Sequence, residues 1–164
     1  MTVHGYATRR SVLTALCGAA AGSLGGCAGL EGGRDPSYEA GSIPDVDDER
    51  TAEEMTAATG LADQEPSDAV TPLGSLSLED HEFVLEDGAS GATVQGTVEN
   101  AGDDRIHLVE IRVRSYDESG DQLGRYLDRT GDLDGGSRWS FEVVLLESVD
   151  DLDAYDVAVL GTPT

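Results

Sequence analysis

Residues 93–124 read TVQGTVENAGDDRIHLVEIRVRSYDESGDQLG, and this stretch decides the fold. Apolar and polar residues alternate in two runs, with Val94 and Val98 in the first and Val109 and Val113 in the second. Alternation with a period of two is typical of a β-strand that buries one face. A segment rich in Gly, Asp and Asn or Ser follows each run and favours a turn. The stretch therefore predicts neighbouring strands of an antiparallel β structure.

The turns and one irregularity are visible in the same part of the sequence. Ile106 and Leu108 are out of step with the apolar positions that follow, so we expect a β-bulge near Leu108 or a strand that enters from a corner. DESGDQ, residues 117–122, is typical of a hairpin turn in which Gly120 supplies a positive φ. LDGGS at residues 133–137 predicts a second hairpin turn.

The same alternation continues to the end of the sequence. It includes Trp139, Phe141, Val143 and Leu145, and then Tyr155, Val157 and Val159. About seven short strands with turns between them and no helical pattern predict an antiparallel β-sandwich over residues 76–164, with a barrel as the alternative. Trp139 and Phe141 share one face of a strand, which favours a place in the core over a ligand groove.

The preceding segment, residues 27–75, has a different composition. Between residues 28 and 75 there are 12 acidic residues, four prolines and a single aromatic residue, Tyr38. Low hydrophobicity and high charge do not offset chain entropy, so we expect a disordered acidic tether. Residues 47–62 have no sustained apolar face, and we expect at most transient helical turns there.

The first 26 residues resemble a signal peptide. Arg9 and Arg10 precede a short run rich in Ala and Gly, and all 33 acidic residues lie after residue 26. The run is shorter than the ~20 apolar residues of a membrane-spanning helix. The arginine pair resembles a twin-arginine export signal, and LGGC, ending at Cys27, resembles a lipobox. A small buried helix with an incidental cysteine is the alternative.

The lipobox resemblance implies a lipid on Cys27, which would hold the mature chain at the extracytoplasmic face of the cell membrane. The membrane is thus the first expected partner.

The charge of the chain restricts its environment and its partners. The sequence holds 33 acidic residues against 10 basic ones, all of them arginine, for a formal net charge of −23. Such self-repulsion is tolerable where concentrated salt screens it, so we expect a salt-adapted protein, with calcium binding or disorder as alternative explanations. Nucleic acid is excluded as a partner, because its phosphates require a basic surface.

Two segments resemble the FxLYD-type domain of archaeal and bacterial surface proteins. Residues 113–117 (VRSYD) occupy the place of the Phe-x-Leu-Tyr-Asp signature, with Tyr116 and Asp117 matching and Val113 and Ser115 substituted. The run GTVENAG at residues 96–102, including Asn100, and the LDGGSRWSFEVVL segment at residues 133–145 fit the family pattern.

Together with the acidity and the lipobox, the chain is most similar to a haloarchaeal lipoprotein of this family. The resemblance implies an immunoglobulin-like sandwich outside the cell and no catalytic residue set. We interpret Tyr116, Asp117 and Asn100 as structural, with Tyr116 bonded to nearby backbone and the other two in turns.

Catalytic and metal-binding patterns are weak. His81 and His107 have no second His or Cys at the spacing of a zinc site. Asp128, Asp132 and Asp134 surround glycines and form a weak calcium hypothesis, against an ordinary acidic turn.

We therefore expect no enzyme, no catalytic residues and no cofactor. The leading hypothesis is a lipid-anchored module with a binding or envelope-structural role, whose loops or exposed sheet edge contact an envelope protein. The alternative is an accessory subunit of a membrane transport or secretion complex.

Overall fold

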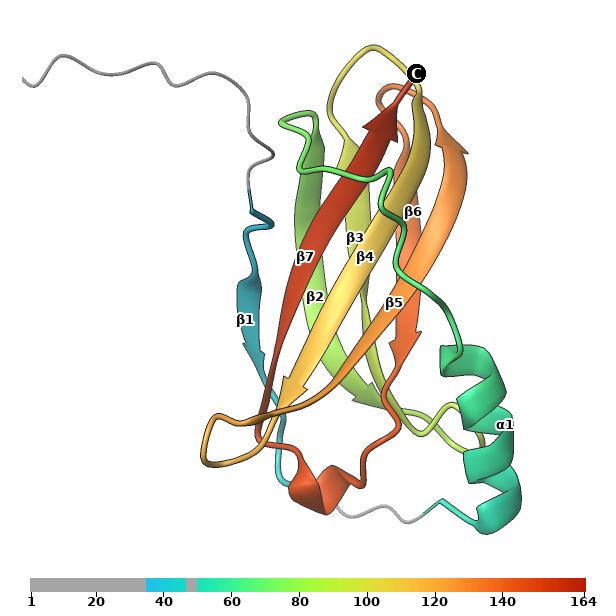
Figure 1. Ribbon diagram of the computed structural model, residues 1–164, viewed down its shortest axis with the longest axis vertical. Coiled ribbons are helices and arrows are strands. Elements are labelled where there is room, and N and C mark those ends of the chain that lie inside the picture. Colours follow the sequence, from blue (N-terminus) through green and yellow to red (C-terminus); the bar gives the residue numbers. More distant parts are fainter. Residues whose placement is uncertain (1–34, 47–49) are drawn as a thin grey trace, which may run out of the picture. The chain divides into compact units, whose positions relative to one another are not determined.

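The computed structural model describes residues 35–46 and 50–164. The strands are β1 (Glu39–Ser42), β2 (Leu76–Leu85), β3 (Ala92–Asn100), β4 (Ile106–Tyr116), β5 (Gln122–Leu133), β6 (Arg138–Val144) and β7 (Ala154–Pro163). One helix, α1 (Ala52–Ala62), precedes β2, and a short 3-10 helix, η1 (Val149–Asp151), precedes β7 (Figure 1).

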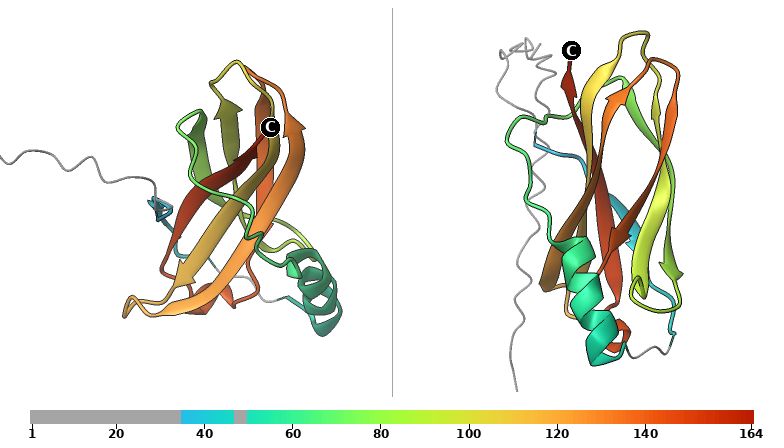
Figure 2. Two further views of the ribbon diagram at one scale, coloured as in Figure 1. Left: turned by 45° about the horizontal axis from the view of Figure 1, so that its top comes forward. Right: turned by 90° about the vertical axis from the view of Figure 1, so that its right-hand side faces the viewer.

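The strands form two antiparallel sheets packed face to face (Figure 2). Sheet A has the order β1-β7-β4-β5, and sheet B has the order β2-β3-β6. The antiparallel β-sandwich predicted from the alternation is confirmed. In immunoglobulin lettering β2, β3 and β6 correspond to strands A, B and E, and β4, β5 and β7 to C, C′ and F. β1 lies beside β7 where the last strand, G, would lie, although β1 comes first in the chain.

The core follows the predicted alternation. On β4, Val109, Ile111 and Val113 are fully buried, and on β6 Phe141 is 2% exposed. Trp139 is partly buried and packs against the same core. The predicted bulge is confirmed, since the register between β4 and β7 shifts between Ile106 and Leu108. The predicted hairpin turn at residues 117–122 is confirmed, with a φ of 81° at Gly120 between the paired strands β4 and β5. The turn predicted at residues 133–137 is present, with a φ of 73° at Gly136, but the prediction of a hairpin there is wrong, because β5 lies in sheet A and β6 in sheet B.

The prediction of a disordered tether is wrong for the described residues between 35 and 75. β1 pairs with Ala154–Val157 of β7. Residues 63–73, which we call the strap, run from α1 across the outer face of sheet A, the face turned away from sheet B (Figures 1 and 2). Thr71 in the strap forms an isolated β-bridge with Gly161. These segments are ordered by hydrogen bonds to the sandwich, which low hydrophobicity does not prevent.

The prediction of transient helical turns is also wrong, because α1 is an 11-residue helix with a complete capping box. The Thr51 hydroxyl accepts a bond from the Glu54 N–H (3.3 Å), and the Glu54 carboxylate accepts one from the Thr51 N–H (2.9 Å). The bond from the Thr51 N–H and a second one from the Thr51 hydroxyl (2.8 Å), both accepted by the carboxylate, lower the pKa of Glu54. Ala58 is fully buried. Within the described ranges, no helix has the length and apolar character needed to cross a membrane.

Arg50 fastens the start of α1 to the sandwich. Its guanidinium donates to the carbonyls of Leu145 (2.7 Å), Ser90 (2.5 Å) and Ala92 (3.3 Å). Gly91 has a φ of 51°, and a Cβ at this position would collide with the Arg50 guanidinium. A rigid guanidinium fork suits several carbonyls at once, so one side chain joins the start of α1 to one end of sheet B.

Candidate functional site

The loops at one end of the sandwich are organised by Asn100, which is fully buried at the end of β3. Its Nδ2 donates to the carbonyls of Asp104 (2.8 Å) and Leu133 (3.1 Å), and its Oδ1 accepts from the Gly102 N–H (3.2 Å). The structural interpretation of Asn100 is confirmed. One amide thus links the β3–β4 loop to the end of β5.

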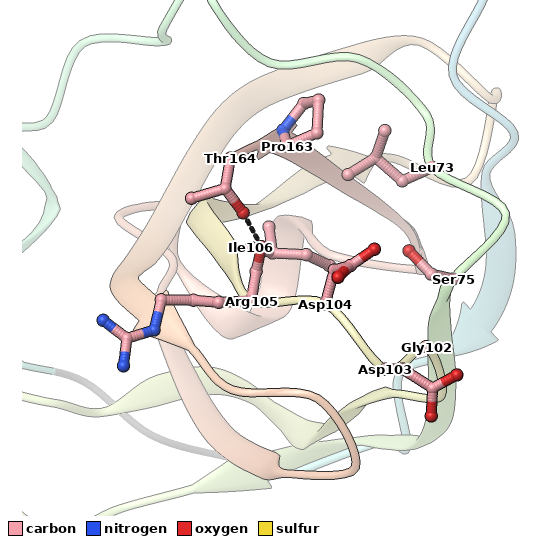
Figure 3. Close-up of a pocket in the computed structure, with 9 residues that line it drawn as sticks. All are labelled: Leu73, Ser75, Gly102, Asp103, Asp104, Arg105, Ile106, Pro163 and Thr164. Atoms are coloured by element: carbon pink, nitrogen blue, oxygen red, sulfur yellow. Dashed lines mark hydrogen bonds between the residues drawn. The ribbon is translucent and has the colours of Figure 1, made fainter.

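Close packing holds the two loops together. A Cβ at Gly135, in the β5–β6 loop, would collide with the main-chain carbonyls of Gly102 and Asp103. The Thr164 hydroxyl donates to the carbonyl of Arg105 (Figure 3). The loop end is therefore a fixed surface on a rigid scaffold.

A cavity of about 390 Å³ opens at this loop end (Figure 3). Its lining combines apolar side chains with polar and charged ones: Leu73, Ile106 and Pro163, then Ser75, Asp103, Asp104, Arg105 and Thr164, with Gly102. Figure 3 shows the Arg105 side chain extending away from the other labelled side chains. This combination of apolar lining and a few polar groups is typical of a binding surface.

The Arg105 guanidinium forms its ion pairs with carboxylates that lie outside the cavity lining. Its Nε lies 2.8 Å from the Asp134 carboxylate and its Nη1 lies 4.0 Å from Asp132. The hydrogen bond to Asp134 raises the pKa of Arg105. Among the described residues, Asp103 and Asp104 form no ion pair, so the cavity carries a negative potential.

The structure does not bring the three calcium candidates together. Asp132 and Asp134 lie beside Arg105, whereas the Asp128 carboxylate accepts from the N–H groups of Arg129 (2.8 Å) and Glu142 (3.2 Å). Over residues 35–46 and 50–164, no group of three or more His, Cys, Asp or Glu side chains is placed to hold a metal ion. The hypothesis that these three carboxylates share one site is wrong, because Asp128 lies in the middle of β5 whereas Asp132 and Asp134 lie at and beyond its end, beside Arg105.

The signature-like residues at the end of β4 are structural. The Asp117 Oδ1 accepts from the N–H groups of Ser119 and Asp121, both at 2.9 Å, so its predicted role in the turn is confirmed. The predicted bond from Tyr116 to backbone is wrong. Its hydroxyl donates instead to the carboxylate of Asp156 (3.1 Å), which β7 places on the same face.

Asp156 is the centre of a small cluster. Arg114 donates to both of its oxygens, at 2.9 and 2.5 Å, and the Tyr38 ring stacks on the Arg114 guanidinium at 3.5 Å. Burial, followed by the bond to Asp156, raises the pKa of Tyr116. The cluster joins the chain before β1 to sheet A, so its groups are engaged in holding the fold.

The two histidines lie apart. His81 Nδ1 is 2.9 Å from the Tyr155 hydroxyl, while His107 Nδ1 is 3.5 Å from Asp132. Burial raises the pKa of Tyr155 to about 12, with a smaller contribution from Glu82. A second cavity of about 380 Å³ lies beside His81 and Tyr155.

The residues expected to export and anchor the chain, Arg9, Arg10 and Cys27, lie outside the described residues.

Sequence reasoning missed Arg50, Glu110 and Arg112 as structural residues. Glu110 alternates with Val109 and Ile111, so the pattern predicts an exposed carboxylate, yet Glu110 is fully buried. No signal in a single sequence distinguishes a charge that faces water from one that another segment covers.

Comparisons with known proteins give one relative and no family. The chain is 29% identical over 93 residues to a protein of Methanocaldococcus jannaschii that is described only as uncharacterized, covering 56% of this chain and 68% of the relative. No family model matches the chain. No solved structure matches it either.

Proposed function

We propose that the chain is a lipid-anchored, non-enzymatic binding module at the extracytoplasmic face of a salt-adapted cell. The observation that carries this proposal is the loop-end cavity, which has a mixed apolar and polar lining, two carboxylates without ion pairs and a scaffold fixed by Asn100. A rigid sandwich with recognition loops at one end is a common basis for binding.

The chemistry of the loop end favours a partner with a basic group. Asp103 and Asp104 are exposed, and Arg105, the nearest cation, is paired with Asp134. An arginine or lysine side chain of an envelope protein would meet both a carboxylate and the apolar stem contacts of Leu73 and Ile106.

Binding at the loop end is tested by passing envelope and membrane extracts of a salt-adapted cell over the immobilised chain in molar salt. We compare the wild type with Asp103→Ser/Asp104→Ser and with Asp150→Ser/Asp151→Ser, which removes two exposed carboxylates from η1 instead. A partner retained by the wild type and the η1 variant but lost from the loop-end variant supports the proposal. Reproducible absence of any retained partner contradicts it, and recovery of a transport or secretion complex would favour the accessory-subunit alternative.

The anchor is tested independently by Cys27→Ser, with Cys17→Ser as the matched control inside the expected signal peptide. We expect the Cys27 variant alone to leave the membrane fraction or to remain unprocessed. Unchanged membrane retention and mature mass in that variant would exclude lipidation at Cys27.

The salt adaptation is tested by thermal unfolding. A formal charge of −23 predicts a lower melting temperature in dilute buffer than in molar salt. Equal melting temperatures would contradict this part of the proposal.

A further inference from the structure

Four arginines gather on the outer face of sheet A in an otherwise strongly acidic chain. Arg114 on β4 pairs with Arg125 on β5, and Glu110 on β4 pairs with Arg129 on β5. Arg112 lies on β4 between Glu110 and Arg114. Directly paired residues lie on one side of a sheet. These four, which we call the arginine face, are four of the seven arginines among the described residues. No other described surface concentrates basic side chains in this way.

The strap covers this face. Glu110 on β4 pairs with Leu160 on β7, and both side chains point outward from the sandwich. Glu110 is nevertheless 0% exposed and Leu160 is 1% exposed. Figure 1 shows the strap passing over β5, β4 and β7, and the edge-on view of Figure 2 places it outside sheet A. The outer face is therefore an occupied binding surface.

Recognition at the centre of the strap uses main-chain atoms. The Ser67 N–H donates to Glu110 (3.0 Å), and the Ser67 carbonyl accepts from Arg112 (2.9 Å). Arg112 Nε also lies 2.7 Å from Glu110. The ion pair thus supplies one acceptor to the N–H and one donor to the carbonyl of a single residue, Ser67, as a neighbouring strand would.

The same pattern extends along the strap at every second residue. The carbonyl of Glu65 accepts from Arg129 (2.7 Å), and that of Ala69 accepts from the Thr162 hydroxyl (2.7 Å). Thr71 exchanges two main-chain bonds with Gly161, at 2.9 and 2.8 Å. Residues 68 and 69 form a turn, and on both sides of it every second residue of the strap directs a main-chain group to sheet A. Sheet A therefore binds the strap through main-chain atoms and requires little of its side chains.

Charge adds a preference for acidic segments to this recognition of main-chain groups. The strap contains Asp63, Glu65 and Asp68 and no basic residue. On the arginine face Glu110 offsets Arg112 and Asp156 offsets Arg114, which leaves Arg125 and Arg129 to favour acidic segments.

We propose that the outer face of sheet A is a binding track for an extended acidic segment of a partner protein, and that the strap is the resident occupant that this segment displaces. The partner segment makes the strap's main-chain bonds to Glu110, Arg112, Thr162 and Gly161. Because the strap is tethered to the face, a free segment binds only to the fraction of molecules whose strap has lifted, which weakens its apparent affinity by that fraction. The track adjoins the loop-end cavity at Leu73, the last residue of the strap, and does not depend on a lipid anchor.

The test uses a fluorescent peptide with the strap sequence, DQEPSDAVTPL, added to the full chain in molar salt, with anisotropy as the measurement. Ser67→Pro removes the N–H that bonds Glu110 and loosens the strap without changing the face. Asp68→Pro is the matched control, since Asp68 is exposed and its N–H makes none of the bonds to sheet A described above. We expect Ser67→Pro to bind the peptide about tenfold more tightly than the wild type and Asp68→Pro do, because its competent fraction is larger.

Two further arms test the recognition chemistry. Adding Arg129→Gln to Ser67→Pro removes a donor to the main chain and should weaken peptide binding several-fold, and replacing the three peptide acids by their amides should do the same. Peptide binding that is no tighter in Ser67→Pro than in the wild type, or that is indifferent to Arg129→Gln, overturns the proposal.

A measurement on the wild type covers the case in which Ser67→Pro does not fold. Excess peptide should accelerate hydrogen exchange of the Ser67 and Thr71 amides, because their partners on sheet A become occupied. Unchanged exchange at saturating peptide likewise overturns the proposal.

Discussion

The sandwich over residues 76–164 and the segment over residues 35–75 are held by different forces. In the sandwich, alternate side chains of facing strands form one apolar core that contains Ile111, Phe141 and Val157. In the preceding segment, β1 and the strap contribute main-chain groups, and arginines or strand edges of the sandwich bind them. Side-chain burial leaves a periodic pattern in a sequence, whereas main-chain docking does not.

The comparison also separates two kinds of stability. Loss of a core side chain affects the whole cooperative unit, because each strand from β2 to β7 contributes to that core. Loss of a docking contact exposes one segment and leaves the sandwich intact. Single substitutions can therefore test this division, with the free energy of unfolding measured by denaturant in constant molar salt.

Phe141→Ala should have the largest effect. Phe141 is 2% exposed at the centre of β6, and truncation leaves a cavity in the shared core, so the free energy of unfolding should fall by about 4 kcal/mol. Leu61→Ala is the control, because Leu61 on α1 is 53% exposed and should cost less than about 0.5 kcal/mol. Similar losses at both positions would mean that α1 shares the core.

Arg112→Met should cost about 3 kcal/mol, because it leaves the buried Glu110 carboxylate without its cation. It should also release the strap, seen as faster hydrogen exchange at Ser67 and Thr71 than on β4. Arg138→Met is the control, since it breaks the ion pair of an exposed arginine with a partly exposed Glu99 and should cost under about 1 kcal/mol. If the strap amides stay protected in Arg112→Met, the strap is held by something other than this ion pair.

Asn100→Ala should cost about 2 kcal/mol, since it leaves the buried carbonyls of Asp104 and Leu133 without donors. Asp104→Ala is a matched control, because Asn100 bonds the main chain of Asp104 and that bond survives the substitution. An equal loss in the two variants would show that the charge of the loop, and not the amide, sets its geometry.

Thr51→Ala should remove the capping box and cost about 1 kcal/mol. The loss should appear as faster exchange in α1 and leave the sandwich unchanged, because Arg50 still holds the start of the helix. Thr56→Ala changes an exposed hydroxyl within α1 and should show no such loss. Destabilisation of β4 by Thr51→Ala would show that α1 and the sandwich unfold as one cooperative unit.

Ionisation of Tyr155 should leave the free energy of unfolding unchanged at neutral pH and should lower it only at alkaline pH. Its folded-state pKa of about 12 lies above the usual 10.0, so the unfolded chain ionises first. The free energy of unfolding should therefore fall as the pH rises from about 10 to about 12, and this part of the decline should be absent in Tyr155→Phe. Identical alkaline profiles for the two proteins would show that β1, whose Gly41 lies against the Tyr155 ring, does not shield the phenol.

Much of the sandwich could be predicted because each strand carries its own local evidence. The parity of Val109, Ile111 and Val113 identified one buried face, and Gly120 identified a hairpin turn. The partner of Tyr116 could not be predicted, because Asp156 lies 40 residues further along the chain and only the β4–β7 register brings the two together.

Local sequence is sufficient for the alternation that makes a two-layered β-sandwich, for the positions of its turns and for the bulge near Leu108. The addition of β1 to sheet A, the position of the strap on the arginine face and the burial of Glu110 depend on contacts between segments far apart in the chain. The physical reason is that a strand's buried face is specified by its own side chains, while a segment docked through its main chain is specified by the donors and acceptors of distant strands.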